Sequence, residues 1–121
     1  MKRFYFFPMG LLSAMVLLFS LLTSCANYGG APAGGNTHVA EAISHAQEAV
    51  KHGDMGHGDE LVKHAEVALS HAKMAQKDSN NPHLAEGVDE LESAISIGGM
   101  GLVGGGTKHA ESAIMHLEQV Q

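Results

Sequence analysis

Apolar residues recur along most of this chain with the period of α-helices. Four segments align without gaps and begin near His38, His57, His83 and Leu102. Within each segment the apolar residues return after three or four positions, so they form one stripe along a helix rather than the alternation of a strand. The position eleven residues into every segment is alanine, at Ala49, Ala68, Ala94 and Ala113. The pattern predicts four amphipathic helices that pack closely through small side chains.

Turn-forming sequences separate the four predicted helices. The breaks lie at residues 53–56, 78–82 and 98–101. Asn81 is a favourable N-cap and Pro82 suits the first helical position, so the third helix should begin there. Residues 104–106 are all glycine, and each glycine costs about 1 kcal/mol in a helix interior relative to alanine. We therefore expect the first turn or two of the fourth segment to be frayed or irregular.

Four helices joined by short connections predict an all-α fold, an antiparallel up-down four-helix bundle. The bundle should occupy residues 37–121 as one small domain. Its core has to be built from Ala, Val, Ile and Leu, because the chain has no tryptophan and a single tyrosine, Tyr28, beyond residue 25.

The first 24 residues differ in composition and predict a signal peptide. Lys2 and Arg3 precede an apolar run over residues 4–22, and small residues then lead to Cys25. This order is typical of secretory signals. Residues 22–25, Leu-Thr-Ser-Cys, resemble the lipobox of bacterial lipoproteins. The resemblance implies lipidation at Cys25 and a membrane-tethered protein of the periplasm or cell envelope, at the outer membrane in a Gram-negative cell. The alternative is an uncleaved signal anchor, since the run is close to the ~20 residues that span a bilayer.

Residues 25–36 are rich in Gly, Pro and Ala and predict a flexible tether. From Cys25 onward, five lysines stand against thirteen acidic residues, a net charge of −8 with neutral histidine. Such a chain repels the phosphates of nucleic acids and attracts cations. A lone cysteine excludes an internal disulfide framework and the usual cysteine-rich zinc sites.

Histidine recurs at every seventh residue of the predicted helices. The series are His38, His45 and His52; His57, His64 and His71; and His109 and His116. With the apolar stripe at the a and d positions of a heptad, these histidines occupy g, beside the core and facing the neighbouring helix. Residues seven apart lie about 10.5 Å apart along a helix axis. They cannot share one metal ion, whose bonds to imidazole nitrogen are about 2.0–2.1 Å. Each ion needs ligands from the same turn or from the next helix.

An antiparallel hairpin should bring the histidines of two helices face to face. The first hairpin then pairs His38 with His71, His45 with His64, and His52 with His57. The same register in the second hairpin pairs His83 with His116, Glu90 with His109, and Ile97 with Leu102. The two apolar replacements fall on one pair, as expected where two partners form one site. This favours about five inter-helix sites over scattered single ligands.

Carboxylates complete the candidate ligand sets. Glu41 and Glu48 alternate with the histidines of the first helix at spacings of three and four, which puts them on one stripe. His-x-x-Glu also occurs at 57–60 and 83–86. Imidazole and carboxylate suit Cu(II), Ni(II) and Zn(II), and the Irving–Williams order predicts the tightest binding in vitro for Cu(II). The candidate metal ligands are His38, His45, His52, His57, His64, His71, His83, His109, His116, Glu41, Glu48, Glu60, Glu86 and Glu90.

The sequence resembles the small metal-binding protein family, histidine-rich periplasmic four-helix proteins that bind copper and other divalent metals. The resemblance runs from about Gly34 to Gln119. It rests on Gly-Gly-Asn-Thr-His-Val at 34–39, Val-Lys-His-Ala-Glu at 62–66, Thr-Lys-His-Ala-Glu at 107–111 and Ala-Ile-Met-His-Leu-Glu at 113–118. It implies a monomeric bundle that takes up several ions through the nine histidines, for buffering, sequestration or tolerance. The chain departs from the pattern at Glu90, Ile97 and Leu102, so the second hairpin should bind fewer ions.

Two other classes of function compete with metal binding. An enzyme is disfavoured because the Glu-x-x-His of di-iron bundles, the His-Glu-x-x-His of zinc proteases and the c-type haem motif are all absent from the sequence. No serine or cysteine has the supporting residues of a nucleophile. A pH-responsive or structural envelope protein would use the same histidines without a metal.

Overall fold

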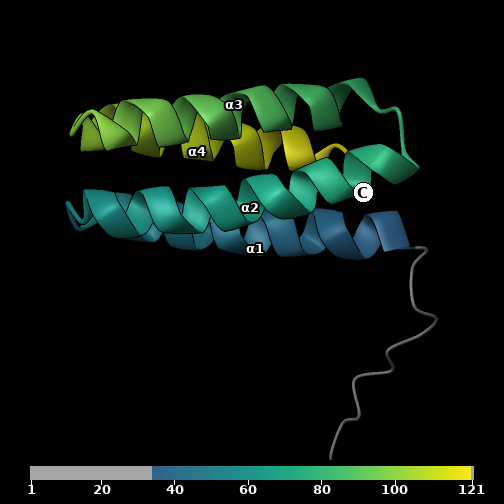
Figure 1. Cartoon of the computed structure of the whole chain (residues 1–121), viewed down its shortest axis with the longest axis horizontal. Helices are drawn as coiled ribbons and strands as arrows, with labels where there is room; N and C mark the ends of the chain where they lie inside the picture. The colour runs from purple at the N-terminus through teal and green to yellow at the C-terminus, as the bar shows by residue number, and fades with distance from the viewer. Residues whose placement is uncertain (1–33, 121) are drawn as a thin grey trace, which may run out of the picture.

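The computed structural model describes residues 34–120, which form four helices. These are α1 (Gly34–Asp54), α2 (Gly58–Asp78), α3 (Pro82–Gly99) and α4 (Val103–Glu118). One layer consists of α1 and α2 and the other of α3 and α4 (Figure 1). Across the layers, α2 packs against α3 and α1 against α4, so each helix packs mainly against two others. The predicted antiparallel four-helix bundle is confirmed.

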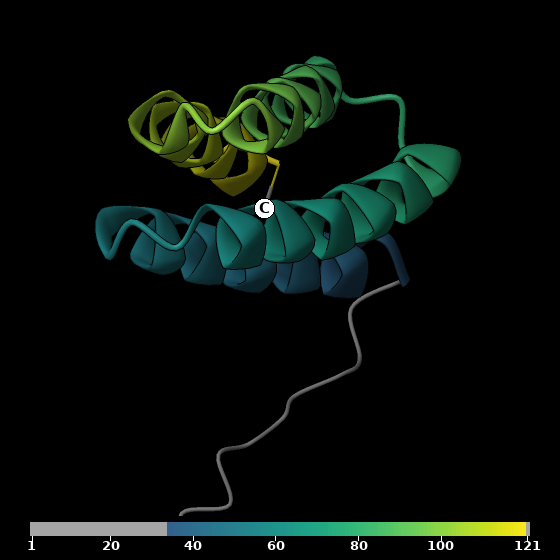
Figure 2. The ribbon, with the colours of Figure 1, turned by 60° about the vertical axis from the view of Figure 1, so that its left-hand side comes forward.

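Both hairpin turns lie at one end of the bundle, and the α2–α3 connection lies at the other end (Figure 2). The two turns have the same backbone. Gly56 has a φ of +78° and Gly101 a φ of +80°, values in the left-handed region that favours glycine. The two glycines are 45 residues apart, as are many equivalent residues of the two hairpins. The bundle is therefore two copies of one helical hairpin.

The N-terminal predictions fall mostly outside the described residues. The signal peptide over 1–24, Cys25 and most of the tether over 25–36 are not described. The structure has α1 beginning at Gly34, three residues before the predicted start of the bundle at residue 37. Within residues 34–120, none of the helices combines the length and the apolarity that crossing a bilayer requires.

Small side chains fill the centre of the bundle. The alanine shared by all four segments is completely buried in each, at Ala49, Ala68, Ala94 and Ala113. Leucines such as Leu61, Leu84, Leu91 and Leu117 provide the bulk between them and are also buried. Because alanine has no side chain beyond Cβ, it lets the helix axes approach. The close packing predicted from the sequence is confirmed.

The start of α3 is capped as predicted. The side-chain oxygen of Asn81 accepts a hydrogen bond of 2.9 Å from the backbone N–H of His83, and Pro82 occupies the first turn. The cap satisfies one of the backbone donors that a helix leaves free at its N-terminus. It fixes where His83 begins the histidine series of the second hairpin.

The expectation of an irregular start to α4 is wrong. The helix is regular from Val103 onward, through all three consecutive glycines. Gly106 is buried, and a Cβ added to it would lie 3.1 Å from backbone atoms of Ala94 and Gly98. The glycine therefore lets α4 lie directly against the backbone of α3. Packing against α3 outweighs the low helix propensity of glycine, which describes an isolated helix.

Candidate metal centres

The histidines of the first hairpin face each other across α1 and α2 in the predicted pairs. The ring centroids are 5.6 Å apart for His38 and His71, 5.9 Å for His45 and His64, and 5.9 Å for His52 and His57. All six residues belong to g positions of the heptad, where side chains lean over the seam between two helices. The cross-helix pairing predicted for this hairpin is confirmed.

The pairs also contact each other along the hairpin. The rings of His45 and His71 lie 5.7 Å apart at an angle of 5°, and those of His52 and His64 lie 5.1 Å apart at 10°. The result is one column of neighbouring imidazoles, stacked in the middle and tilted at both ends. We define it as the histidine column, which runs in the order His38, His71, His45, His64, His52 and His57. The sequence predicted the opposed pairs but not the contacts between successive pairs.

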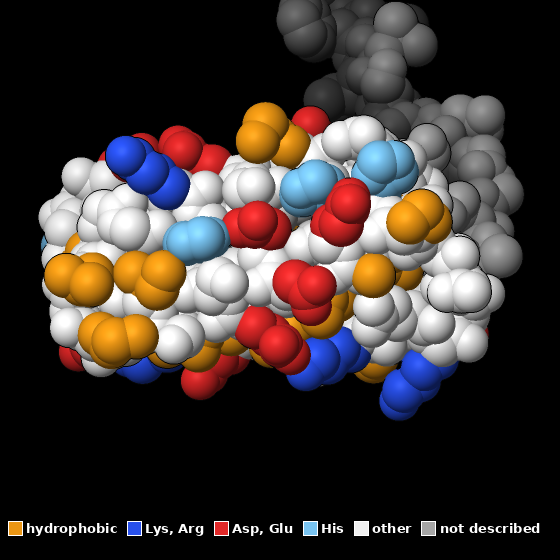
Figure 3. All heavy atoms as spheres, turned by 90° about the horizontal axis from the view of Figure 1, so that it is seen from above, with side chains coloured by type: hydrophobic (Ala, Val, Ile, Leu, Met, Phe, Trp, Pro, Cys, Tyr) orange, Lys and Arg blue, Asp and Glu red, His pale blue; other side chains and the backbone are white. Residues whose placement is uncertain are grey.

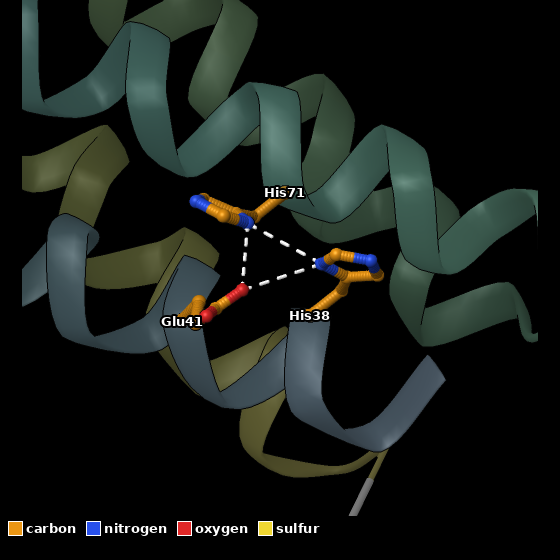
Figure 4. Close-up of side chains that lie close together, drawn as sticks. All are labelled: His38, Glu41 and His71. Carbon is orange, nitrogen blue, oxygen red and sulfur yellow. Dashed lines mark hydrogen bonds and ion pairs between the residues drawn. The ribbon is translucent and has the colours of Figure 1, made fainter. Parts of the chain in front are cut away.

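At one end of the column a carboxylate joins two histidines. The Oε2 atom of Glu41 lies 3.3 Å from Nδ1 of His38 and 2.9 Å from Nδ1 of His71, and the two nitrogens are 3.4 Å apart. Figure 4 shows the three side chains converging in front of α1 and α2, with the other helices behind. We call this group site 1.

The second hairpin repeats the group 45 residues further along the chain. The Oε2 atom of Glu86 lies 3.1 Å from Nδ1 of His83 and 3.0 Å from Nδ1 of His116. Its imidazole centroids are 6.2 Å apart. Figure 3 views the molecule from the side of the α3–α4 layer and shows histidine and acidic side chains next to one another there. We call this group site 2.

The three donor–donor distances of site 1, and the two carboxylate–imidazole distances of site 2, match those between ligands of one metal ion. Atoms bound to Zn(II) at about 2.0–2.2 Å, with bond angles between perpendicular and tetrahedral, lie about 2.9–3.5 Å apart. Two histidines and one glutamate also form a common three-ligand set that leaves a position for water. Within residues 37–120, sites 1 and 2 are the groups of three or more histidine, cysteine or acidic residues whose donor atoms meet closely enough to hold an ion.

The remaining candidate ligands are brought together less completely. Glu90 contacts Nδ1 of His109 at 2.7 Å and so forms the predicted pair, a group of two ligands. Glu48 lies instead 3.5 Å from Lys51, and Glu60 lies 3.9 Å from Lys63. These contacts follow the three-residue spacing of glutamate and lysine on one helix. The structure thus has two three-ligand groups where the sequence predicted about five inter-helix sites.

The apolar pair of the second hairpin occupies the position of His52 and His57. The backbone N–H of Leu102 donates to the carbonyl of Ile97 at 3.2 Å, as His57 donates to His52 at 2.9 Å in the first hairpin. Cγ2 of Ile97 lies 2.8 Å from where a Cβ on Gly105 would be. Ile97 therefore packs onto α4 where the first hairpin continues its histidine column.

A four-helix bundle that carries two equivalent His–Glu–His groups defines a helical protein able to hold metal ions. The family comparison agrees with that class. The chain belongs to the small metal-binding protein family, whose model matches residues 9–120. The resemblance seen in the sequence is therefore confirmed. A search of curated proteins finds no match to this chain.

Proposed function

We propose that this protein is exported to the cell envelope and there binds several divalent transition-metal ions. The observation that carries the proposal is the repetition of one ligand group, His38–Glu41–His71 and His83–Glu86–His116, at equivalent places in both hairpins. Two helices contribute to each group, so folding of the hairpin assembles the ligands. A net charge of −8 after residue 25 adds a general attraction for cations.

The donor atoms favour Cu(II), Ni(II) and Zn(II) as the bound ions. Imidazole nitrogen and carboxylate oxygen are borderline to hard ligands that suit all three. The Irving–Williams order places Cu(II) first in vitro for any such site. Each bound ion would keep a coordination position for water. Bound ions could therefore exchange with ions in the surrounding solution.

Buffering, sequestration or tolerance, rather than catalysis, is the role we assign to these sites. The shared glutamates are about half exposed, 47% for Glu41 and 53% for Glu86. Ions can therefore enter and leave directly from solvent. Small-molecule substrates are normally held in clefts that bury most of their surface, and such exposed groups offer little surface for that.

The predicted signal peptide and tether give the proposal its location. We propose a lipid anchor at Cys25 and a monomeric bundle carried outside the membrane by residues 25–36. The bundle would then meet ions as they cross the periplasm or envelope. Cell fractionation and mass measurement of the processed N-terminus test this part independently of metal binding.

Titration of the purified protein with Cu(II), Ni(II) and Zn(II) tests the metal-binding part. We expect at least two ions to bind at micromolar concentrations. Glu41→Gln and Glu86→Gln should each weaken one ion, and their effects should add because the sites lie in separate hairpins. Glu111→Gln, an exposed change on α4, serves as the control. Uptake of one ion or none would refute the proposal and favour a protein that uses its histidine–glutamate contacts without metal.

A further inference from the structure

We propose that His45, Glu48 and His64 form a third ion site in the first hairpin. Lys51 competes with the ion at this site, because it pairs with Glu48 and keeps the carboxylate away from the two histidines. The proposal rests on the metal-binding function proposed above and adds a specific ligand set and a competitor to it. We call this group site 3. Sites 1 and 2 already have their three donor atoms together, whereas site 3 has its two histidines in place and its carboxylate turned away.

The heptad register repeats site 1 one step along the hairpin. His45 and Glu48 follow His38 and Glu41 by seven residues on α1, and His64 precedes His71 by seven on the antiparallel α2. The ligand positions on both helices are therefore shifted by about 10.5 Å in the same direction along the hairpin. The imidazole pair keeps its geometry, with centroids 5.9 Å apart at 26° for site 3 and 5.6 Å at 33° for site 1.

A buried nitrogen at site 3 has no partner. Nδ1 of His45, like those of His52 and His116, is buried and makes no hydrogen bond within the part of the chain that the structure describes. Nδ1 of His116 nevertheless lies 3.0 Å from the carboxylate of Glu86 in site 2. The equivalent of the His45 atom in site 1, Nδ1 of His38, lies 3.3 Å from the carboxylate of Glu41. Buried polar side-chain atoms normally have a hydrogen-bond partner. The carboxylate that would complete the pattern belongs to Glu48, three residues along the same helix.

The contact that occupies Glu48 is weak. Its Oε2 atom lies 3.5 Å from Nζ of Lys51, and the two side chains are 45% and 65% exposed. Exposed ion pairs of this kind contribute little to stability. Glu41 occupies the equivalent position of the helix and contacts both of its histidines, so a glutamate at this position can reach them by rotation of its side chain. A divalent ion between His45 and His64 would draw Glu48 from lysine by the same rotation.

The same pattern is not repeated further along α1 or in the second hairpin. One heptad further along α1, the residue equivalent to Glu48 is Met55, so α1 supplies no carboxylate to His52 and His57, and Glu60 of α2 lies 3.9 Å from Lys63. In the second hairpin the residues equivalent to His45 and Glu48 are Glu90 and Ser93. Glu90 contacts His109 directly there, and that pair has no further carboxylate in register.

Zinc titration of the full chain tests site 3, with ions counted by native mass spectrometry and affinities taken from calorimetry. Glu48→Gln should weaken one Zn(II) ion by at least about tenfold, since even outer-shell partners of metal ligands contribute that much. Lys51→Gln should strengthen the same ion several-fold. Glu92→Gln is the control, because Glu92 is also an exposed carboxylate paired with a lysine and is not a candidate ligand, and it should change neither.

The outcomes separate this inference from the proposed function. If the wild-type protein binds no Zn(II), both fail. If Glu41→Gln weakens an ion while Glu48→Gln leaves every ion unchanged, metal binding stands and site 3 is overturned. Equal losses in Glu48→Gln and Glu92→Gln would show a general effect of charge and would also overturn it. Circular dichroism of each variant confirms that helix content is unchanged.

Discussion

The imidazole rings of His45 and His71 lie parallel, 5.7 Å apart, although the heptad register pairs neither with the other. His45 is opposed by His64 and His71 by His38. The contact between pairs arises because successive histidines of the two helices interleave. Each inner histidine therefore has two imidazole neighbours, so a change at one pair reaches the next.

The opposed pair of His45 and His64 predicts that both histidines bind the same ion in the first hairpin. Replacing His45 or His64 by alanine should weaken the same ion, and replacing both should add little, because either loss already breaks the pair. Zinc affinities of the two single variants and the double variant give the coupling directly. The combination of His45→Ala with His109→Ala, in separate hairpins, should be additive. Additive losses for His45 and His64 would contradict the paired arrangement.

The second hairpin offers a gain of function. Glu90→His together with Ser93→Glu restores the residues of site 3 opposite His109, and the position equivalent to Lys51 is Ser96, which cannot compete for the new carboxylate. We expect the double variant to bind one Zn(II) ion more than the wild-type protein. Glu90→His alone is the control and should add a weaker ion. An unchanged ion count in the double variant would show that the ligand register is insufficient.

Occupied sites should also stabilise the fold. Each of sites 1 and 2 joins two helices at the end of a hairpin opposite its turn, so a bound ion closes the open end. A ligand that binds only the folded state adds about 2.7 kcal/mol at a free concentration a hundred times its Kd. Thermal unfolding followed by circular dichroism should move to higher temperature with Zn(II). The shift should shrink in Glu41→Gln/Glu86→Gln, and an equal shift in that variant would place the stabilising ions elsewhere.

Two of the three glycines at the start of α4, Gly104 and Gly106, should respond oppositely to alanine. Gly106→Ala would place Cβ 3.1 Å from the backbone of Ala94 and Gly98, which forces α4 away from α3 and should lower the free energy of unfolding by about 1–3 kcal/mol. Gly104 has no neighbouring atom within 4 Å of an added Cβ, so Gly104→Ala should raise that free energy by up to about 1 kcal/mol. Urea unfolding without metal measures both. A Gly106→Ala protein as stable as the wild type would contradict the close helix contact.

The sequence predicted the bundle because its signals were strong and agreed with each other. The apolar stripe defined the helices, Asn81 and Pro82 defined the start of α3, and the seven-residue histidine spacing defined the register of both hairpins. The regular start of α4 was not predictable from propensity. The contribution of Gly106 depends on the backbone of α3, which comes close only in the folded bundle.

The candidate sites were predictable in part. The histidine pairs followed from the antiparallel register, and Glu41 and Glu86 follow their histidines by three residues on the same helical stripe. The orientation of Glu48 and Glu60 could not be deduced, because each has histidines and a lysine within reach. The free energies of alternative ion pairs of one exposed carboxylate differ by less than about 1 kcal/mol. Sequence spacing does not resolve such differences.

We propose that metal ions bind where Glu41 and Glu86 each join two histidines. Anomalous diffraction at the zinc edge from crystals of the Zn(II)-loaded protein tests it most directly. We expect one peak within bonding distance of Glu41 and both of its histidines, and a second within bonding distance of Glu86 and both of its own. Zinc bound elsewhere on the protein, with neither position occupied, would contradict it.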